Sequence, residues 1–318
     1  MQNDAMIDIR DLSVTFRRGG KTVRAVNGVS LSVQPGEVVA LLGESGSGKS
    51  VTMRSLLRLH PKGTLIEGAM TVDGRDVTGL SSRALSDLRG AVVSMVFQEP
   101  RLALDPVYTV GSQIEETIMR HEKVPRAVAA ERALALFQKV RIPSPERRLA
   151  NYPHEMSGGT LQRAMIAMAL ACNPKVLLAD EPTTALDATV QIQILLLIRE
   201  LQREYGLSVI FVTHDIGVAA EVADRIAVMY AGRIVEEGLV GDIIRNPRHP
   251  YMLGARVELA EGRDRLITIP GAPPDLAAMP PGCAFAPRCA QVTDLCRTQV
   301  PPLVPLSGGA GVACLVSN

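Results

Sequence analysis

The segment "GESGSGKS" at residues 43–50 constrains the fold of this chain more than any other feature. It follows "EVVALLG" (37–43), an almost continuous apolar run that is typical of a buried parallel strand. The segment precedes "VTMRSLLRL", which has a helical pattern. The eight residues fit G-x-x-x-x-G-K-[ST] in the strand–loop–helix setting that this pattern requires. The alternative, a glycine-rich turn that binds nothing, explains neither the complete pattern nor its setting.

The chemistry expected of this segment is phosphate binding. Glycine lets the backbone curl so that successive N–H groups point inward, and the following helix adds the positive end of its dipole. Lys49 would reach the β- and γ-phosphates of a nucleotide, and the Ser50 hydroxyl would bind Mg²⁺. We therefore expect ATP contacts from Gly43, Glu44, Ser45, Gly46, Ser47, Gly48, Lys49, Ser50 and Val51.

A second apolar run, "VLLADEP" (176–182), ends in two carboxylates. Asp180 lies where the predicted strand emerges and can hold the Mg²⁺ shell, directly or through water. Glu181 is placed to polarise a water that attacks the γ-phosphate. Alone, such a pair is more typical of a solvated surface than of a catalytic site, but the upstream phosphate loop favours the catalytic interpretation.

Further motifs follow these two in a fixed order. Gln98 ends the predicted strand 91–98, "MSGGTLQR" spans 156–163, "TTALD" spans 183–187, and "FVTHD" places His214 at the end of a strand. Together, these motifs closely resemble those of the nucleotide-binding subunits of ABC transporters, over residues 7–245.

The resemblance implies roles at the reacting phosphate. Gln98 would contact Mg²⁺ or the lytic water and report the nucleotide state to a membrane partner. His214 would contact the γ-phosphate as the switch histidine. The Mg²⁺ ligands implied are Ser50, Gln98 and Asp180. Phe16 would stack on adenine, although a core role for this strand residue is nearly as compatible with the pattern.

The resemblance also implies a second subunit. Ser157, Gly158 and Gly159 match the signature loop, which closes over the ATP of a facing subunit, and Asp187 matches the aspartate that communicates across the dimer. The family's usual "LSGGQ" is "MSGGT" here, with Met156 and Thr160 at the changed positions. We expect the loop to function because its serine and both glycines are intact.

The fold implied is α/β: a P-loop NTPase cassette with a mixed sheet, an antiparallel β subdomain and a helical subdomain at about 100–172. Strands are also predicted at 7–16, 26–33, 207–214 and in the pair 225–230 and 232–238, and a helix at 188–206. We place the nucleotide-binding domain at 1–245 and a loop-rich extension at 246–318, where proline and glycine become dense.

Composition excludes other classes. Lys+Arg 34 against Asp+Glu 33 and aromatic residues at 3% argue against a nucleic-acid binder. No signal-peptide pattern and no apolar run of about 20 residues is present, so we expect a cytosolic chain. The resemblance to ABC transporter subunits implies that it acts peripherally at the cytoplasmic face of a bacterial inner membrane. A soluble ABC ATPase of DNA repair or translation is a rival hypothesis, but it predicts a long insertion or two cassettes. A regulatory subunit with little hydrolysis is disfavoured by intact Glu181 and His214.

The extension indicates the transporter type. "NPRHPYMLGAR", with His249, Pro250 and Tyr251, and the proline-rich stretch after it resemble the C-terminal extension of oligopeptide and dipeptide importer ATPases. Relatives that import nickel, glutathione or oligosaccharides share this extension, so the cargo stays open. The expected partners are a second ATPase subunit (a paralogue or a second copy), two permeases and, indirectly, an extracytoplasmic solute-binding protein.

Four of the five cysteines lie in the last 36 residues: Cys283, Cys289, Cys296 and Cys314. In a reducing compartment, clustered thiols are more typical of metal ligands than of disulfides. The spacing matches neither common zinc ribbons nor the bacterial ferredoxin run, and four thiolates can serve Zn²⁺ or a [4Fe–4S] cluster. The family resemblance favours the cluster. For Cys172 we expect a small buried residue on a helix.

Overall fold

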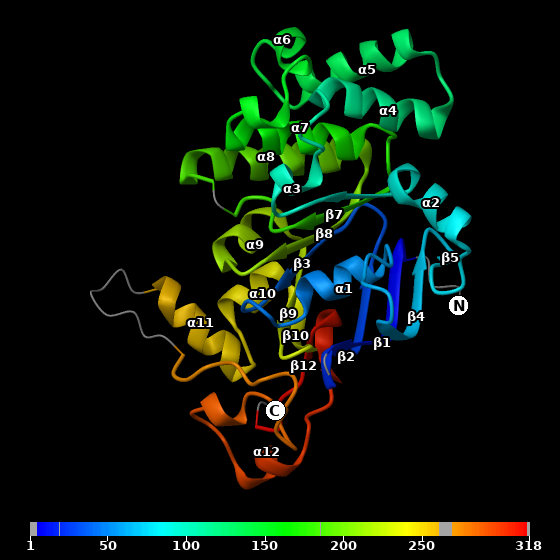
Figure 1. The fold of residues 1–318 in the computed structure, drawn as a ribbon. Helices are drawn as coiled ribbons and strands as arrows, with labels where there is room; N and C mark the ends of the chain where they lie inside the picture. Colours follow the sequence, from blue (N-terminus) through cyan, green and yellow to red (C-terminus); the bar gives the residue numbers. More distant parts are fainter. Residues whose placement is uncertain (1–4, 19, 185, 261–268, 317–318) are drawn as a thin grey trace. The chain divides into compact units, whose positions relative to one another are not determined.

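The computed structural model describes residues 5–18, 20–184, 186–260 and 269–316 (Figure 1). Two compact units divide the chain. Unit 1 contains 33–37 and 72–211 with the N-terminal residues up to 6, and unit 2 contains 7–32, 38–71 and 212–318. The phosphate loop and the C-terminal extension therefore belong to the same unit.

Unit 2 is built on two sheets. The first has the strand order β2-β1-β4, in which β1 and β2 are joined as a hairpin. In the second, with the order β11-β12-β10-β9-β3, β3 is parallel to β9, whereas β10 is antiparallel to both β9 and β12. The strands are β1 (Ile7–Arg18), β2 (Lys21–Val33), β3 (Val38–Leu42), β4 (Leu65–Val72), β9 (Arg225–Tyr230), β10 (Arg233–Leu239), β11 (Val304–Pro305) and β12 (Gly311–Val312).

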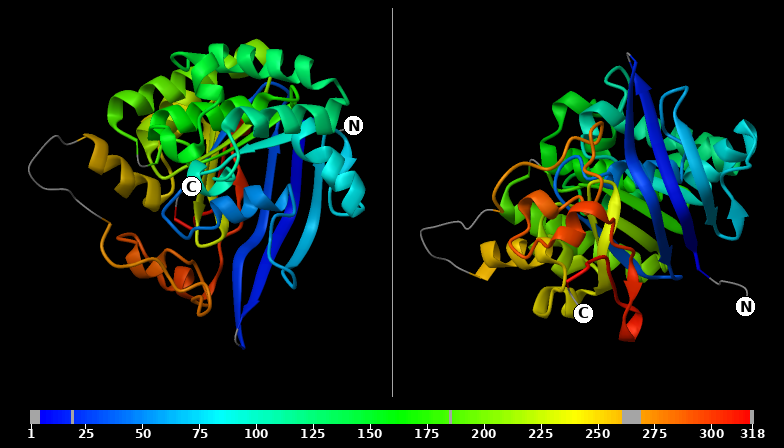
Figure 2. Two further views of the ribbon diagram at one scale, coloured as in Figure 1. Left: turned by 45° about the horizontal axis from the view of Figure 1, so that its top comes forward. Right: turned by 90° about the horizontal axis from the view of Figure 1, so that it is seen from below.

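The helices of unit 2 are short. They are α1 (Lys49–Ser55), α9 (Ile216–Val222), α10 (Val240–Arg245), α11 (Pro250–Ala260) and α12 (Asp294–Thr298), with 3-10 turns at Ala286–Arg288 and Ser307–Gly309. After α11 the described chain is mostly loop, as the orange and red segments of Figure 2 show. One apolar cluster joins Tyr230 of β9, Ile243 of α10 and Tyr251 of α11 to Phe285 of the extension. This cluster gives the proline-rich tail a core that its own length could not supply.

Unit 1 contains the long helices. Strands run in the order β8-β7-β6, and β6 is parallel to β7. The elements are β5 (Arg75–Asp76), α2 (Ser82–Ala91), β6 (Val93–Val96), α3 (Pro100–Ala103), α4 (Val110–Glu122), α5 (Arg126–Lys139), α6 (Pro145–Leu149), a 3-10 turn (Pro153–Glu155), α7 (Gly158–Leu170), β7 (Val176–Asp180), α8 (Ala188–Tyr205) and β8 (Ser208–Thr213). Helices α3 to α7 lie within the range expected for the helical subdomain.

The predicted fold class is confirmed, with corrections at element ends. The predicted strand 91–98 is shorter, because Ala91 belongs to the end of α2, and Gln98 lies two residues beyond β6 rather than at its end. Helix α1 ends at Ser55, and Arg58 has a φ of 49°, which a continued helix excludes. Cys172 is half-buried and lies just beyond α7, not within it. Within the described residues, no helix combines the length and apolar character that crossing a bilayer requires.

Candidate functional site

The phosphate loop connects β3 to α1 in unit 2. All five residues of β3 are buried, so the strand fixes the start of the loop in the core. Gly48, at the N-cap of α1, has a φ of 102°, and a Cβ there would lie 2.6 Å from the carbonyl oxygen of Ala25. A Cβ at Gly43 would lie 2.2 Å from the carbonyl oxygen of Met229. Glycine is required at both positions because the neighbouring backbone approaches this closely.

Two side chains of the loop are buried among its backbone. The ammonium of Lys49, whose residue is 4% exposed, donates to the carbonyl oxygens of Gly43 (2.7 Å) and Glu44 (2.9 Å). Ser47 is also buried, and its hydroxyl has no hydrogen-bond partner among the described residues. A buried cation beside an unsatisfied hydroxyl, in a backbone curl that admits no Cβ at Gly43 or Gly48, fits a bound phosphate group.

In unit 1, two predicted catalytic residues meet at neighbouring strand ends. Val96 of β6 is paired with Ala179 of β7, so the chain segments that follow both strands lie close together. The Gln98 amide donates to Oε2 of Glu181 at 3.4 Å. The Thr184 hydroxyl donates to the same oxygen at 3.0 Å, and the sequence analysis did not single out this threonine. The sequence did contain a signal for this contact. The hydroxyl of a residue three positions after a candidate general base can hydrogen-bond back to that base within one turn.

The backbone at Glu181 is unusual. Its φ is +45°, in the left-handed region that a glutamate rarely adopts, and it directly follows the fully buried Asp180. A turn from Glu181 O to Thr184 N at 3.2 Å supports this conformation. Strain of this kind persists only where the surroundings hold it, and it is enriched at functional sites. Asp180, as a hard oxygen donor at the end of a buried strand, is a suitable ligand type for Mg²⁺.

The signature loop begins helix α7. The Ser157 hydroxyl caps the helix by accepting from Thr160 N (3.4 Å) and lies 2.8 Å from the Thr160 hydroxyl. Ser157 and Gly158 are exposed, whereas Met156 anchors the loop in the core at 2% exposed. Thr160, where the family has glutamine, therefore shortens the side chain but gains a contact with the serine of the motif.

The remaining predicted site residues occupy element ends. The Asp187 carboxylate is exposed and caps α8 by accepting from Val190 N at 3.0 Å. His214 is exposed and directly follows β8. Phe16 is half-buried in β1, and its ring lies edge-on to that of His60 with centroids 5.7 Å apart. Residues 43–51, Phe16 and His214 belong to unit 2, and Gln98, Asp180, Glu181, Asp187 and the signature loop belong to unit 1.

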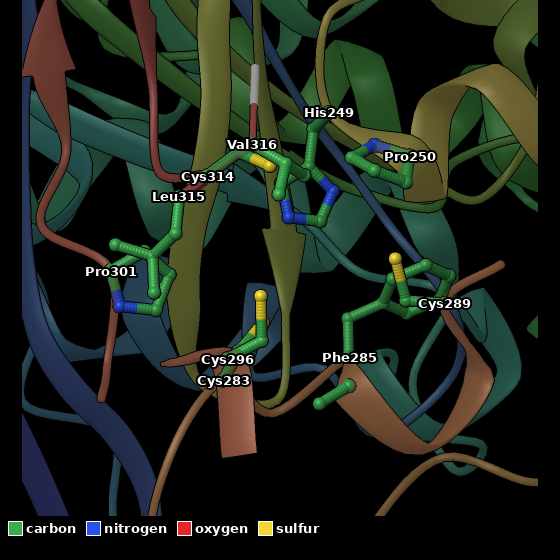
Figure 3. A pocket seen from close by; sticks show the side chains of 11 residues that line it. His249, Pro250, Cys283, Phe285, Cys289, Cys296, Pro301, Cys314, Leu315 and Val316 are labelled. Carbon is green, nitrogen blue, oxygen red and sulfur yellow. The ribbon is translucent and has the colours of Figure 1, made fainter. Parts of the chain in front are cut away.

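The four cysteines of the extension line one small pocket, although they come from separate segments (Figure 3). Cys296 is 6% exposed, and all four are free thiols. The rest of the pocket wall is mainly apolar, and His249, which also lines it, has a pKa lowered by burial to about 4 and is therefore neutral. The structure thus brings together four thiols that the sequence separates.

The surroundings of two of the thiols disfavour their ionised form. Burial raises the pKa of Cys283 and of Cys289, and charge on neighbouring cysteines raises both further. A hydrogen bond between Thr293 and the Cys296 sulfur, 3.2 Å apart, lowers the pKa of Cys296. Such a set fits a cation in chemistry and in number. The described residues nevertheless contain no group of three or more His, Cys, Asp or Glu side chains placed to hold a metal ion, so the predicted [4Fe–4S] or Zn²⁺ site is not supported as a formed ligand set.

Two family models match the chain. One, described as ABC transporter, covers residues 26–184, and one, described as oligopeptide/dipeptide transporter C-terminal region, covers residues 235–296. The first spans the phosphate loop, Glu181 and the signature loop. The second includes "HPY" and three of the four clustered cysteines.

The chain is also similar to individual proteins over nearly its full length. A Brucella melitensis protein named for peptide import and ATP binding is 47% identical over 99% of this chain and 98% of its own. The oligopeptide transport ATP-binding protein OppD of Bacillus subtilis is 46% identical over 95% of this chain and 86% of its own. Among solved structures, the dimeric cassette MJ0796 in a post-hydrolysis state with ADP and Pi has a TM-score of 0.67 at 30% identity, over 74% of this chain and 99% of that one.

The geometry and the comparisons agree. A phosphate loop at the end of a buried strand, a carboxylate oriented by Gln98, a capped signature loop and the "HPY" extension occur in one chain. The chain belongs to the ABC transporter family, to the ATP-binding subunits that carry the oligopeptide/dipeptide transporter C-terminal region.

Proposed function

We propose that this chain hydrolyses ATP to energise an ABC importer of dipeptides or oligopeptides. The observation that carries the proposal is the phosphate loop, in which Lys49 and Ser47 are buried in a glycine curl at the end of β3. The named relatives, which are peptide import and oligopeptide transport proteins, supply the cargo class. Nickel, glutathione and oligosaccharides remain the alternative cargoes.

The first step is nucleotide binding. Backbone N–H groups of the loop and the N-terminus of α1 would hold the phosphates, and Lys49 would exchange its contacts with the loop carbonyls for the β- and γ-phosphates. Phe16 would contact adenine. When bound, Mg²⁺ would neutralise developing phosphate charge, and the ligand types suited to it are Ser50, Gln98 and Asp180.

The second step is attack by water on the γ-phosphate. Glu181 would polarise the water with its carboxylate, whose Oε2 accepts from both Gln98 and Thr184. These two donors fix the orientation of the carboxylate before the nucleotide arrives. His214 would contact the γ-phosphate and help to hold the transition-state geometry.

The third step needs a partner. We infer a second ATPase subunit, either a paralogue or a second copy, whose Ser157–Gly159 loop closes over the ATP of the first and whose Asp187 communicates across the dimer. Closure would drive two permease subunits, with a solute-binding protein supplying cargo from outside. The chain would then act peripherally at the cytoplasmic face of the membrane.

Replacement of the general base tests the catalytic proposal. In the assembled transporter, Glu181→Gln should reduce kcat by at least about 100-fold, the usual contribution of a general base, while ATP still binds. Glu200→Gln is the matched control, because Glu200 is exposed on α8 and pairs with Arg141. Unchanged turnover in Glu181→Gln would remove the catalytic assignment.

The cargo class is tested by stimulation of ATPase activity. The transporter and its binding protein are reconstituted, and turnover is compared with a dipeptide mixture, an oligopeptide mixture, Ni²⁺, glutathione and an oligosaccharide. Peptides should stimulate turnover and the others should not. Stimulation by one of the other compounds alone would reassign the cargo.

We also propose that the four cysteines of the extension hold a [4Fe–4S] cluster, with Zn²⁺ as the alternative. Support comes from the family resemblance and from their convergence on one pocket without disulfides. The group would staple a segment that is too rich in proline to form a core.

Metal analysis of protein purified without oxygen tests this proposal. Four iron and four sulfide per chain are expected, and Cys283→Ser, Cys289→Ser, Cys296→Ser or Cys314→Ser should lose them. Cys172→Ser is the control, because Cys172 lies outside the pocket and burial raises the pKa of its thiol to about 11. One zinc per chain would select the alternative, and protein without metal would reject both.

A further inference from the structure

Glu44, the second residue of the phosphate loop, is hydrogen-bonded to residues of the C-terminal extension. Arg288 donates from its two Nη atoms to the two carboxylate oxygens of Glu44, at 2.9 and 3.0 Å. This bidentate, end-on pair is a strong, geometrically specific form of an arginine–carboxylate contact. The Arg288 side chain is 6% exposed and the Glu44 side chain 28% exposed, so the guanidinium is shielded from solvent while the carboxylate is partly accessible.

Arg288 is itself held rigidly. Its remaining donors reach the Tyr230 hydroxyl (3.2 Å) and the carbonyl oxygens of Pro270 (3.2 Å) and Ile269 (3.4 Å). Together with Glu44, these acceptors use all five N–H donors of a guanidinium. An arginine fixed in this way positions its partner, because neither its plane nor its reach can adjust.

A second residue of the extension holds the backbone at the same place. The Glu44 N–H donates to the Tyr251 hydroxyl at 3.1 Å. Tyr251 is buried, and its ring contacts those of Tyr230 and Phe285 at centroid distances of 5.1 and 5.7 Å. The hydroxyl is therefore presented to the loop by a packed aromatic cluster.

Glu44 links these contacts to the phosphate-binding lysine. Its carbonyl oxygen accepts from Lys49 at 2.9 Å, so its N–H, carbonyl and carboxylate are all engaged. Arg288 and Tyr251 hold Glu44 from outside the loop, and both lie in the extension. Releasing them would let the first turn of the loop relax, together with the acceptor that orients Lys49.

We propose that Arg288 and Tyr251 are positioning residues for nucleotide binding: the C-terminal extension clamps Glu44 and so sets the affinity of the phosphate loop for ATP. This inference rests on the proposed ATPase function. It gives the extension a role in the ATPase cycle, through its contact with Glu44, besides any role of its cysteines.

The test is a double-mutant cycle in the full chain. Arg288→Gln, Glu44→Gln and the pair are compared by calorimetry with Mg·ATP and by turnover in the assembled transporter. Each single variant should raise the Kd and KM for ATP about tenfold, as loss of a charged hydrogen bond predicts, while kcat stays within about twofold. The pair should be no worse than either single variant. A merely structural defect would instead lower the active fraction and the apparent kcat at constant KM.

Tyr251→Phe keeps the ring and removes only the hydroxyl, so it tests the backbone contact even if Arg288→Gln fails to fold. It should raise the KM about threefold. Arg297→Gln, an exposed arginine on α12 of the same extension, is the matched control and should change nothing. Failure of the wild type to bind ATP would refute the ATPase function. Binding by the wild type with unchanged Kd in Arg288→Gln and Tyr251→Phe, or additive effects in the pair, would refute the clamp alone.

Discussion

At the scale of single residues, the carboxylate that we propose as the general base has partners that hold its orientation. Glu181 has a left-handed φ of 45°, and its Oε2 accepts from two donors of different chemistry, an amide and a hydroxyl. The family resemblance placed Gln98 near Mg²⁺ or the lytic water, but it predicted neither the hydrogen bond of Gln98 to Glu181 nor that of Thr184. Motif recognition identifies residues by type and order, whereas hydrogen bonds to a turn depend on local torsions.

Thr184→Val should therefore impair hydrolysis without impairing binding. Loss of one hydrogen bond to a charged group predicts a decrease in kcat of about tenfold, with an unchanged Kd for ATP. Steady-state turnover and calorimetry in parallel measure the two quantities. Thr189→Val on the exposed face of α8 is the control. Equal kcat values for Thr184→Val and the wild type would show that Gln98 orients Glu181 alone.

At the scale of elements, helix ends carry much of the site. Ser157 and Asp187, both predicted from motifs, are the N-caps of α7 and α8. Gly206 ends α8 with a φ of 63°, as its place after the helical pattern predicts. Where a functional motif coincides with a cap, substitution affects stability and activity together, so the two effects need separate measurements.

At Gly159 the effects of a substitution on stability and on activity can be measured separately. A Cβ at this position would lie 2.7 Å from Cγ1 of Val190 on α8, so Gly159→Ala should destabilise unit 1 by about 1–3 kcal/mol through overpacking. Val190→Ala in the same chain should restore the urea midpoint, because it removes the contacted methyl group. ATPase activity should stay low in the double variant if a facing nucleotide approaches the Gly159 N–H so closely that the added methyl group blocks it. Recovery of both properties would assign Gly159 to packing alone.

At the scale of the whole molecule, the phosphate loop and the extension share one compact unit. The apolar cluster around Tyr230, Tyr251 and Phe285 joins strand β9 to loops far along the chain. The division at residue 245 between the nucleotide-binding domain and the extension stays a prediction. Because the extension contacts Glu44, the stability of unit 2 depends on both the phosphate-loop segment and the extension.

The acid stability of the chain should depend in part on His60. Burial, aided by the positive charge of Arg54, lowers the pKa of His60 below its usual 6.5. Below pH 6.5 the folded protein therefore binds fewer protons at His60 than the unfolded one. The contribution of neutral His60 to the free energy of unfolding is complete above pH 6.5 and is lost as the pH falls below it. Urea midpoints at pH 7.5 and 5.5 should differ more for the wild type than for His60→Gln. His154→Gln, at an exposed histidine, should retain the wild-type difference, and an equal difference in all three proteins would contradict the prediction.

Features that depend only on neighbours along the chain could be predicted from the order of the residues. The apolar run before "GESGSGKS", the glycines within it and the helical pattern after it specify strand, loop and helix by local sterics and burial, and so predict phosphate binding. The carboxylates of Asp180, at the end of β7, and of Glu181, directly after it, are local in the same sense, as are the caps of α7 and α8. Their order along the chain was enough to identify the family.

Which groups far apart along the chain come into contact depends instead on the packing of the folded unit. Arg288 and Glu44 are 244 positions apart, and nothing in the proline-rich tail distinguishes this arginine from Arg297. Likewise, the spacing of the four cysteines left their placement open, and the structure gathers them at one pocket without a formed set of metal ligands. Such contacts depend on how buried surfaces pack across the unit. The Arg288 guanidinium can pair with the Glu44 carboxylate only where the packing of the aromatic cluster brings the two backbones close together.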